Sequence, residues 1–182
     1  MRVLTCIAGV SLCLLCGCAG TAQEISIDQP TRNTASVCFS EDGVTCSGRG
    51  VQYINSSVMI SSPGTYTISG KNNHARIIVN SEKDGEVHLI LENTGLSAEE
   101  GPVITVENSD RTIITVPNGT SSVLGTQGKD ESGEDAVIYS VDDLRIDGSG
   151  KLTLHGTDKD PISAEEDLDI QNVDLCLIHG EE

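Results

Sequence analysis

Ala136-Val-Ile-Tyr-Ser-Val-Asp-Asp-Leu-Arg-Ile146 decides the fold, because its pattern recurs one period later as Asp160-Pro-Ile-Ser-Ala-Glu-Glu-Asp-Leu-Asp-Ile170. Matching positions carry the same apolar residues, as in the pairs Leu144/Leu168 and Ile146/Ile170. A fixed period of this length is typical of a solenoid in which each repeat forms one coil. Equivalent residues of a parallel β-helix lie about 4.8 Å apart in neighbouring strands. The repeat therefore favours a parallel β-helix over a β-sandwich, whose antiparallel hairpins need no such period.

Short runs of β-branched residues continue this pattern toward the N-terminus. No stretch sustains a helical period over three turns, so we expect an all-β fold. The interval from Ile104 to Ile138 is longer than the interval from Ile138 to Ile162, and the polar loop 125–135 accounts for the extra length. Such insertions usually map to surface corners. The expected strands are 58–60, 65–68, 77–79, 87–91, 103–106, 113–116 and 137–139.

The 182-residue chain is strongly acidic, with 11 basic and 28 acidic residues and a net charge of −17. Such a surface repels phosphate backbones, so nucleic acid is excluded as a partner. Docking to a membrane through a basic patch is excluded for the same reason. The chain has three Tyr, one Phe and no Trp. Few rings are therefore present to stack on sugar faces, and crystalline cellulose is a poor candidate ligand.

Residues 1–17 indicate an export signal, because one positive charge precedes an apolar run too short to span a bilayer comfortably. The junction Leu15-Cys16-Gly17-Cys18 resembles a bacterial lipobox, in which Cys18 would be acylated and become the mature N-terminus. Acyl chains would then anchor the protein to the membrane without a spanning helix. Cleavage after Gly20-Thr21-Ala22, releasing a secreted protein, is the alternative.

This N-terminal pattern predicts three segments in the chain. Residues 1–17 are a lipoprotein signal peptide, residues 18–36 a flexible tether, and residues 37–182 the folded domain. The tether is polar and without apolar pattern, which is typical of a disordered linker. The expected location is the bacterial cell envelope, at the outer membrane or cell surface.

Three cysteines fall in the predicted domain, and export permits disulfides between them. Cys38 and Cys46 flank Ser40-Glu-Asp-Gly43, a turn signal that could place them face to face. The sequence is compatible both with a Cys38–Cys46 disulfide and with two free thiols, because a disulfide demands a specific Cα separation that sequence does not give. Cys176, in an apolar run, is expected to be a small buried thiol.

Three blocks carry a family resemblance: Ser61-Ser-Pro-Gly-Thr-Tyr-Thr-Ile-Ser-Gly70, Val87-His-Leu-Ile-Leu91 and Val141-Asp-Asp-Leu-Arg-Ile-Asp-Gly-Ser-Gly-Lys-Leu-Thr-Leu154. They resemble a bacterial carbohydrate-binding β-helix family, known for a clostridial surface protein that binds cellulose and pectic polysaccharide. The resemblance implies a right-handed parallel β-helix similar to that of pectate lyases, with bound calcium. The family continues through further Asp-rich coils, so the last coil here is expected to be incomplete. Its open edge could mediate self-association.

An acidic corner of the repeat is the candidate calcium site. Stacking would bring Asp142-Asp143 beside Glu166-Asp167, where unscreened carboxylates repel. Calcium accepts six to eight oxygen ligands in irregular loops and would remove that repulsion. The alternative is an acidic, solvated corner that keeps the protein soluble. The candidate ligands are Asp135, Asp142, Asp143, Asp158, Asp160, Glu166 and Asp167.

Two further side-chain types could carry chemistry. Uronate lyases of this fold abstract a proton with Arg or Lys beside bound calcium, and Arg145 is the candidate here. Arg145 also lies one full period before Asp169, which favours a structural salt bridge instead. His155 and His179 share the same period, and we expect them to stack at a turn rather than bind zinc.

The sequence predicts a non-catalytic, calcium-dependent, polysaccharide-binding lipoprotein whose ligand is an acidic or plant cell-wall polysaccharide. A uronate lyase-like enzyme and a structural or adhesive surface protein are the alternatives. A polyuronate would suit the charge best, because calcium can share ligands between two acidic partners.

Overall fold

The computed structural model describes residues 33–82, 85–127, 136–156 and 160–179, and these form strands and turns without a helix. Cys18, Asp135 and Asp158, for which roles were predicted, lie outside the described residues. Within these ranges no helix is long and apolar enough to cross a bilayer. The expectation of an all-β fold is confirmed.

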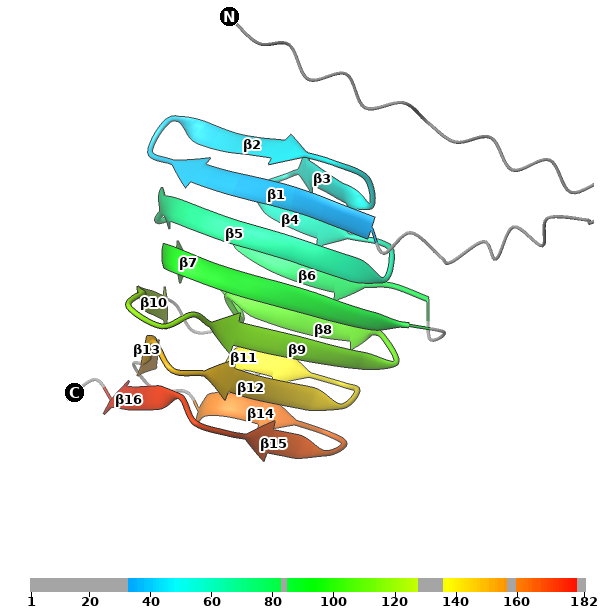
Figure 1. The fold of residues 1–182 in the computed structure, drawn as a ribbon. Helices are drawn as coiled ribbons and strands as arrows, with labels where there is room; N and C mark the ends of the chain where they lie inside the picture. The colour runs from blue at the N-terminus through cyan, green and yellow to red at the C-terminus, as the bar shows by residue number, and fades with distance from the viewer. Residues whose placement is uncertain (1–32, 83–84, 128–135, 157–159, 180–182) are drawn as a thin grey trace, which may run out of the picture. The chain divides into compact units, whose positions relative to one another are not determined.

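The strands follow one another with short turns between them (Figure 1). Their bounds are β1 (Asn33–Ser40), β2 (Gly43–Ser47), β3 (Val51–Ile54), β4 (Ser57–Ile60), β5 (Gly64–Asn72), β6 (Arg76–Asn80), β7 (Glu86–Ala98), β8 (Ile104–Asn108), β9 (Arg111–Val116), β10 (Ser121–Thr126), β11 (Ala136–Ser140), β12 (Leu144–Gly148), β13 (Lys151–Gly156), β14 (Asp160–Ala164), β15 (Leu168–Ile170) and β16 (Asp174–His179). Every strand expected from the sequence lies within one of these elements or overlaps it.

Two sheets of mainly parallel strands make up the domain. The six-stranded sheet has the order β14-β11-β8-β6-β4-β3, and the ten-stranded sheet contains the remaining strands. The long strand β7 pairs with β9 through its first half and with β10 through its second half. Asn93, with φ of 53°, stands where the pairing of β7 with β5 shifts register. The large sheet therefore divides at β7 into the rows β9-β12-β15 and β10-β13-β16.

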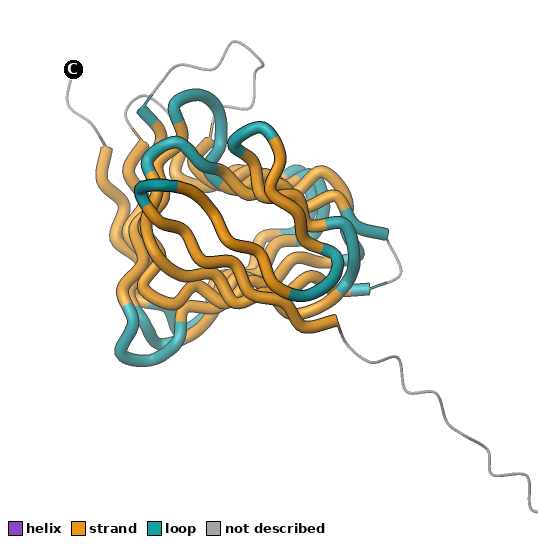
Figure 2. The backbone as a smooth tube through the Cα atoms, turned by 90° about the horizontal axis from the view of Figure 1, so that it is seen from above, coloured by secondary structure: helices purple, strands orange, loops and turns teal. Residues whose placement is uncertain are grey.

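A three-strand unit recurs along the chain from residue 104 onward. The units are β8-β9-β10, β11-β12-β13 and β14-β15-β16, and equivalent strands of successive units pair in parallel. Leu144 faces Leu168, and Ile138 faces both Ile104 and Ile162, as the repeat and its insertion predict. Viewed along the direction of stacking, successive units lie over one another (Figure 2).

In each sheet, the first two strands along the chain pair with each other as an antiparallel hairpin. Strand β1 pairs with β2 and β3 pairs with β4, whereas β1 and β4 also pair in parallel with β5 and β6. The predicted tether to residue 36 is therefore too long, because Asn33–Ser36 already pair with Gly64–Thr67 of β5. Tyr66 joins these segments: its buried hydroxyl accepts from Asn33 Nδ2 at 3.0 Å and donates to the Ser62 carbonyl at 2.7 Å. Burial raises the pKa of the Tyr66 phenol.

The possible Cys38–Cys46 disulfide is absent, although the predicted hairpin is present. Val37, not Cys38, faces Cys46 across the hairpin, and Cys38 faces Thr45. Successive side chains of a strand point to opposite faces, so a one-residue offset separates the thiols. Cys38 is exposed, Cys46 packs against the core, and both are free. Burial raises the pKa of the Cys46 thiol.

Cys176 is less buried than the sequence predicted. It is free and only half-buried, in register with Thr153 of β13, while its neighbours Leu175 and Leu177 pair with the fully buried Leu152 and Leu154. Alternation along β16 therefore places Cys176 on the outward face of the sheet.

The core consists of apolar columns that run through successive strands. One column contains Leu89 of β7, Ile114 of β9 and Ile146 of β12, each fully buried and paired with the next. In the last unit the same columns are open: Leu168 is 44% exposed, whereas its partner Leu144 is 1% exposed. This agrees with an uncovered face at β14-β15-β16 among the described strands. Self-association at that face stays a prediction.

This difference in burial gives a direct test of the packing. Leu144→Ala leaves a cavity between two units and is expected to lower the free energy of unfolding by about 2–5 kcal/mol. Leu168→Ala, at the equivalent position, removes a largely exposed side chain and should cost about 1 kcal/mol or less. Urea denaturation of both variants measures the difference. Equal losses would contradict the burial described here.

Candidate functional site

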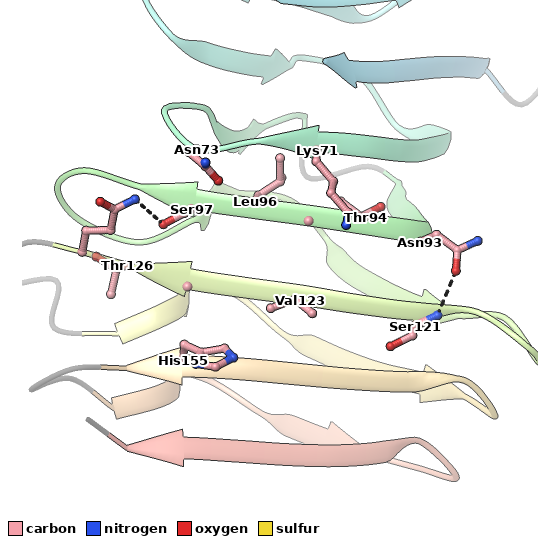
Figure 3. A pocket seen from close by; sticks show the side chains of 13 residues that line it. Lys71, Asn73, Asn93, Thr94, Leu96, Ser97, Ser121, Val123, Thr126 and His155 are labelled. Atoms are coloured by element: carbon pink, nitrogen blue, oxygen red, sulfur yellow. Dashed lines mark hydrogen bonds between the residues drawn. The ribbon is translucent and has the colours of Figure 1, made fainter. Parts of the chain in front are cut away.

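A groove of about 710 Å³ crosses the outer face of the sheet where β5, β7, β10 and β13 lie side by side (Figure 3). This volume is within the range of ligand sites in proteins. Lys71 and Asn73 line it at the β5 end, and His155 lines it on β13. The second half of β7 and the whole of β10 lie between them. The groove therefore extends across four strands.

Strand alternation decides which side chains the groove receives. In β10, Ser122 and Leu124 are fully buried, whereas Val123 is 41% exposed and lines the groove. Gly95 and Gly125 add backbone without a side chain. A Cβ at Gly95 would lie 2.9 Å from Lys71 Cγ, and one at Gly125 would lie 3.2 Å from His155 Cβ. The two glycines thus leave room for the Lys71 and His155 side chains and keep the floor low.

Hydrogen bonds between neighbouring strands hold both long edges of the groove. On one edge the backbone N–H of Ser121 donates to Asn93 Oδ1 at 3.1 Å. On the other edge Gln127 Nε2 donates to Ser97 Oγ at 2.9 Å, and both bonds are drawn in Figure 3. Asn93, Ser97 and Gln127 therefore place amide and hydroxyl groups along the two edges.

The charge of the groove differs from that of the whole protein. The chain contains 28 Asp and Glu residues, yet none of the described lining residues is acidic. Lys71 and His155 are the lining residues that carry or can gain a positive charge. The described lining of the groove therefore presents no carboxylate to a negatively charged ligand.

The predicted calcium ligands stack as expected but do not gather. The backbone N–H of Leu144 donates to the Asp167 carbonyl at 2.9 Å, which places the two acidic turns one above the other. Asp142 is only 2% exposed, and its Oδ2 accepts from the backbone N–H of Ser109 at 2.8 Å. Asp143 Oδ2 instead pairs with Arg111 Nη2 at 3.2 Å.

Burial of one carboxylate and pairing of its neighbour explain why these side chains diverge. Asp160 and Glu166 are both exposed, Asp160 as the first residue of β14 and Glu166 in the turn beside Asp167. Among the described residues, no three His, Cys, Asp or Glu side chains come close enough to hold a metal ion. The described acidic residues alone therefore do not form a metal site, and the predicted ligands Asp135 and Asp158 lie outside the described residues.

Arg145 lies outside the groove, on β12, and it is part of a network of acidic and amide groups. Its Nε is 3.1 Å from Asp147 Oδ2 and 3.9 Å from Asp169 Oδ2, and its Nη2 donates to Gln171 Oε1 at 3.0 Å. The predicted pairing with Asp169 is confirmed, because the two residues are in register between β12 and β15. These contacts support a structural role for Arg145 over proton abstraction.

The predicted stack of His155 on His179 is wrong. His155 of β13 is in register with Ile178 of β16, and Gly156 is in register with His179. The segment from Ile170 to Asp174 is one residue shorter than the paired segment from Ile146 to Lys151, so the period shortens by one residue in this row.

The groove could not be predicted from the sequence because its segments are unevenly spaced. Three of them lie at residues 71–73, 93–97 and 121–127, before the 24-residue sequence repeat that begins at Ala136. One signal was present: all three segments lack Asp and Glu in a chain that is otherwise rich in both.

The Arg145 network yields a prediction about stability. Arg145 and its partners are partly exposed, so Arg145→Ala should lower the free energy of unfolding by about 1 kcal/mol or less, because exposed ion pairs contribute little. Urea denaturation measures this loss. A loss of several kcal/mol would show that the network holds β12 and β15 together.

Comparison with known proteins gave three findings. The family model described as carbohydrate-binding domain-containing protein matches residues 54–179. A protein of the same description from Acetivibrio thermocellus is 28% identical over 169 residues, which cover 89% of this chain and 59% of that protein. The solved structure of a polysaccharide lyase-like protein from C. thermocellum, in a gadolinium derivative, matches with a TM-score of 0.69 and 28% identity. That match covers 75% of this chain and 58% of the other, so the chain spans a little over half the length of both relatives.

Proposed function

Because the chain belongs to the family of carbohydrate-binding domain-containing proteins, we propose that it is a non-catalytic module that binds an acidic polysaccharide in the groove over β5, β7, β10 and β13. The observation that carries this proposal is the absence of acidic residues from the described groove lining, in a protein with a net charge of −17. Polyanions are repelled by the rest of such a surface and reach the groove preferentially.

The polar lining supports a sugar ligand as well as a negative one. Asn73, Asn93, Ser97 and Gln127 offer both donors and acceptors, which is what hydroxyl groups require. None of the described lining residues is Tyr, Phe or Trp. Recognition would therefore rest on hydrogen bonds and charge, rather than on the ring stacking common in proteins that bind neutral glycans.

The proposed architecture is a right-handed parallel β-helix with one three-strand unit per coil. Its support is the parallel pairing of equivalent strands across successive units, together with the match to a polysaccharide lyase-like protein. In this arrangement the outward residues of successive coils line up into columns, and the groove runs along such columns.

Envelope anchoring and calcium dependence are the other parts of the proposal, and both concern residues outside the described ranges. The motif ending at Cys18 supports a lipid anchor, which would hold the domain at a bacterial membrane. Calcium would be held at the acidic corner with help from Asp135 or Asp158. Arg111 and Arg145 already neutralise part of this corner without metal.

Affinity electrophoresis in gels containing polygalacturonate tests the proposal. Wild-type protein should be retarded, and Lys71→Ala should bind about fivefold more weakly, since one charged contact contributes about 1 kcal/mol. Arg145→Ala is the matched control: it removes the same charge outside the groove, so its retardation should equal that of the wild type. Equal weakening by both variants, or unretarded wild type, would overturn the site.

A second set of gels separates calcium from the groove. Each protein is run with calcium and again with excess chelator. Loss of retardation on chelation supports calcium dependence, whereas unchanged retardation removes calcium from the proposal and leaves the groove in place. Folding of each variant is checked by urea denaturation beforehand.

A further inference from the structure

The geometry points to a specific binding mode, which rests on the proposed function: the groove holds an internal segment of an extended, unbranched glycan that crosses the strands, with one sugar residue over each of β5, β7, β10 and β13. Four consecutive sugars would then fill the site.

The strand register supplies the repeat that this mode requires. Lys71 pairs with Gly95, Gly95 with Val123 and Val123 with Thr153, so these residues form one outward column over four strands. Neighbouring strands lie about 4.8 Å apart, which is close to the length of one hexose in an extended chain. A glycan along the column therefore stays near an equivalent backbone position at each sugar, because the offset between the two repeats remains small over four sugars.

A second column runs beside the first with the same spacing. Ser97 pairs with Gly125, and Gly125 pairs with His155. The two columns alternate between glycine and larger side chains: Gly95 is followed by Val123 in one, and Ser97 by Gly125 in the other. The two central strands thus each contribute one residue without a side chain, Gly95 beneath the Lys71 side chain and Gly125 beside His155.

The long edges of the groove carry polar side chains, and its two ends are formed by the strands that carry the basic residues. Amides and hydroxyls form the long edges, through the Asn93–Ser121 and Ser97–Gln127 hydrogen bonds. The basic side chains stand at the two ends, with Lys71 on β5 and His155 on β13. Their strands are three spacings apart, about 14 Å, and the Lys71 side chain extends from β5 over Gly95 of β7 (Figure 3). Contact with all four strands therefore needs more than a disaccharide, and four sugars supply it.

Binding should therefore depend on oligomer length up to the tetramer. Each added sugar between the dimer and the tetramer gains contacts with another strand, and sugars beyond the fourth extend past the lining. A side chain placed on the floor should block all lengths that need the centre. Gly95 has no positive φ, so its backbone accepts a larger residue, and the contact of the new Cβ is with the flexible Lys71 side chain.

Isothermal titration calorimetry with oligogalacturonides from the dimer to the hexamer tests this mode, with cello-oligosaccharides as a neutral series. We expect the affinity for at least one series to rise more than tenfold from the dimer to the tetramer and to change less than twofold from the tetramer to the hexamer. Gly95→Leu should weaken tetramer binding more than tenfold. Thr67→Leu, which adds the same side chain to the outward face of β5 away from the groove, should leave it unchanged.

The outcomes separate this inference from the proposed function. Polygalacturonate retardation that depends on Lys71, together with equal affinity for dimer and hexamer, would overturn the binding mode and leave the proposed function standing. A steady rise in affinity through the hexamer would do the same, because it requires more than four subsites. Absence of binding in both series and in the polymer gels would overturn both.

Discussion

Parallel pairing in register between successive units is the constraint on which the rest of this structure depends. Because side chains alternate between faces along a strand, a slip of one residue would exchange the core columns for the surface columns. The pairs Leu144/Leu168 and Ile146/Ile170 show the register that keeps apolar residues inside. The same register aligns Lys71, Gly95 and Val123 on the outside. One interaction thus builds both the core and the groove.

Charge is distributed on the large sheet in a way that follows from its two rows. The row β9-β12-β15 carries acidic residues together with Arg111 and Arg145, which pair with them. Strands β10 and β13 carry Ser, Val, Gly and His on the groove face, and their described lining residues are not acidic. Hydrogen bonds also link His88 of β7 to Thr115 of β9 and Thr115 to Asp147 of β12. The described groove face of β10 and β13 therefore lacks the carboxylates that the row β9-β12-β15 carries.

Much of the fold could be predicted from the sequence, because a repeat of constant length specifies register directly. The strand positions, the parallel pairing of Leu144 with Leu168 and the insertion before Ile138 all followed from it. Side-chain direction at turns could not be predicted. Turn geometry decides that the Asp142 carboxylate points inward to a backbone N–H. It also decides the hairpin register, in which Cys38 is one residue away from the position that faces Cys46. The groove could not be predicted from the sequence, because the residues of its columns are separated by unequal intervals along the chain.

The most direct measurement of where the ligand binds is a titration of isotope-labelled protein with tetragalacturonate, followed by backbone amide chemical shifts. The largest shifts are expected in residues 71–73, 93–97 and 121–127 and at His155, which line the four strands of the groove. The largest shifts at Asp142–Asp143 and Glu165–Asp167 would contradict this, and would place binding at the acidic corner instead.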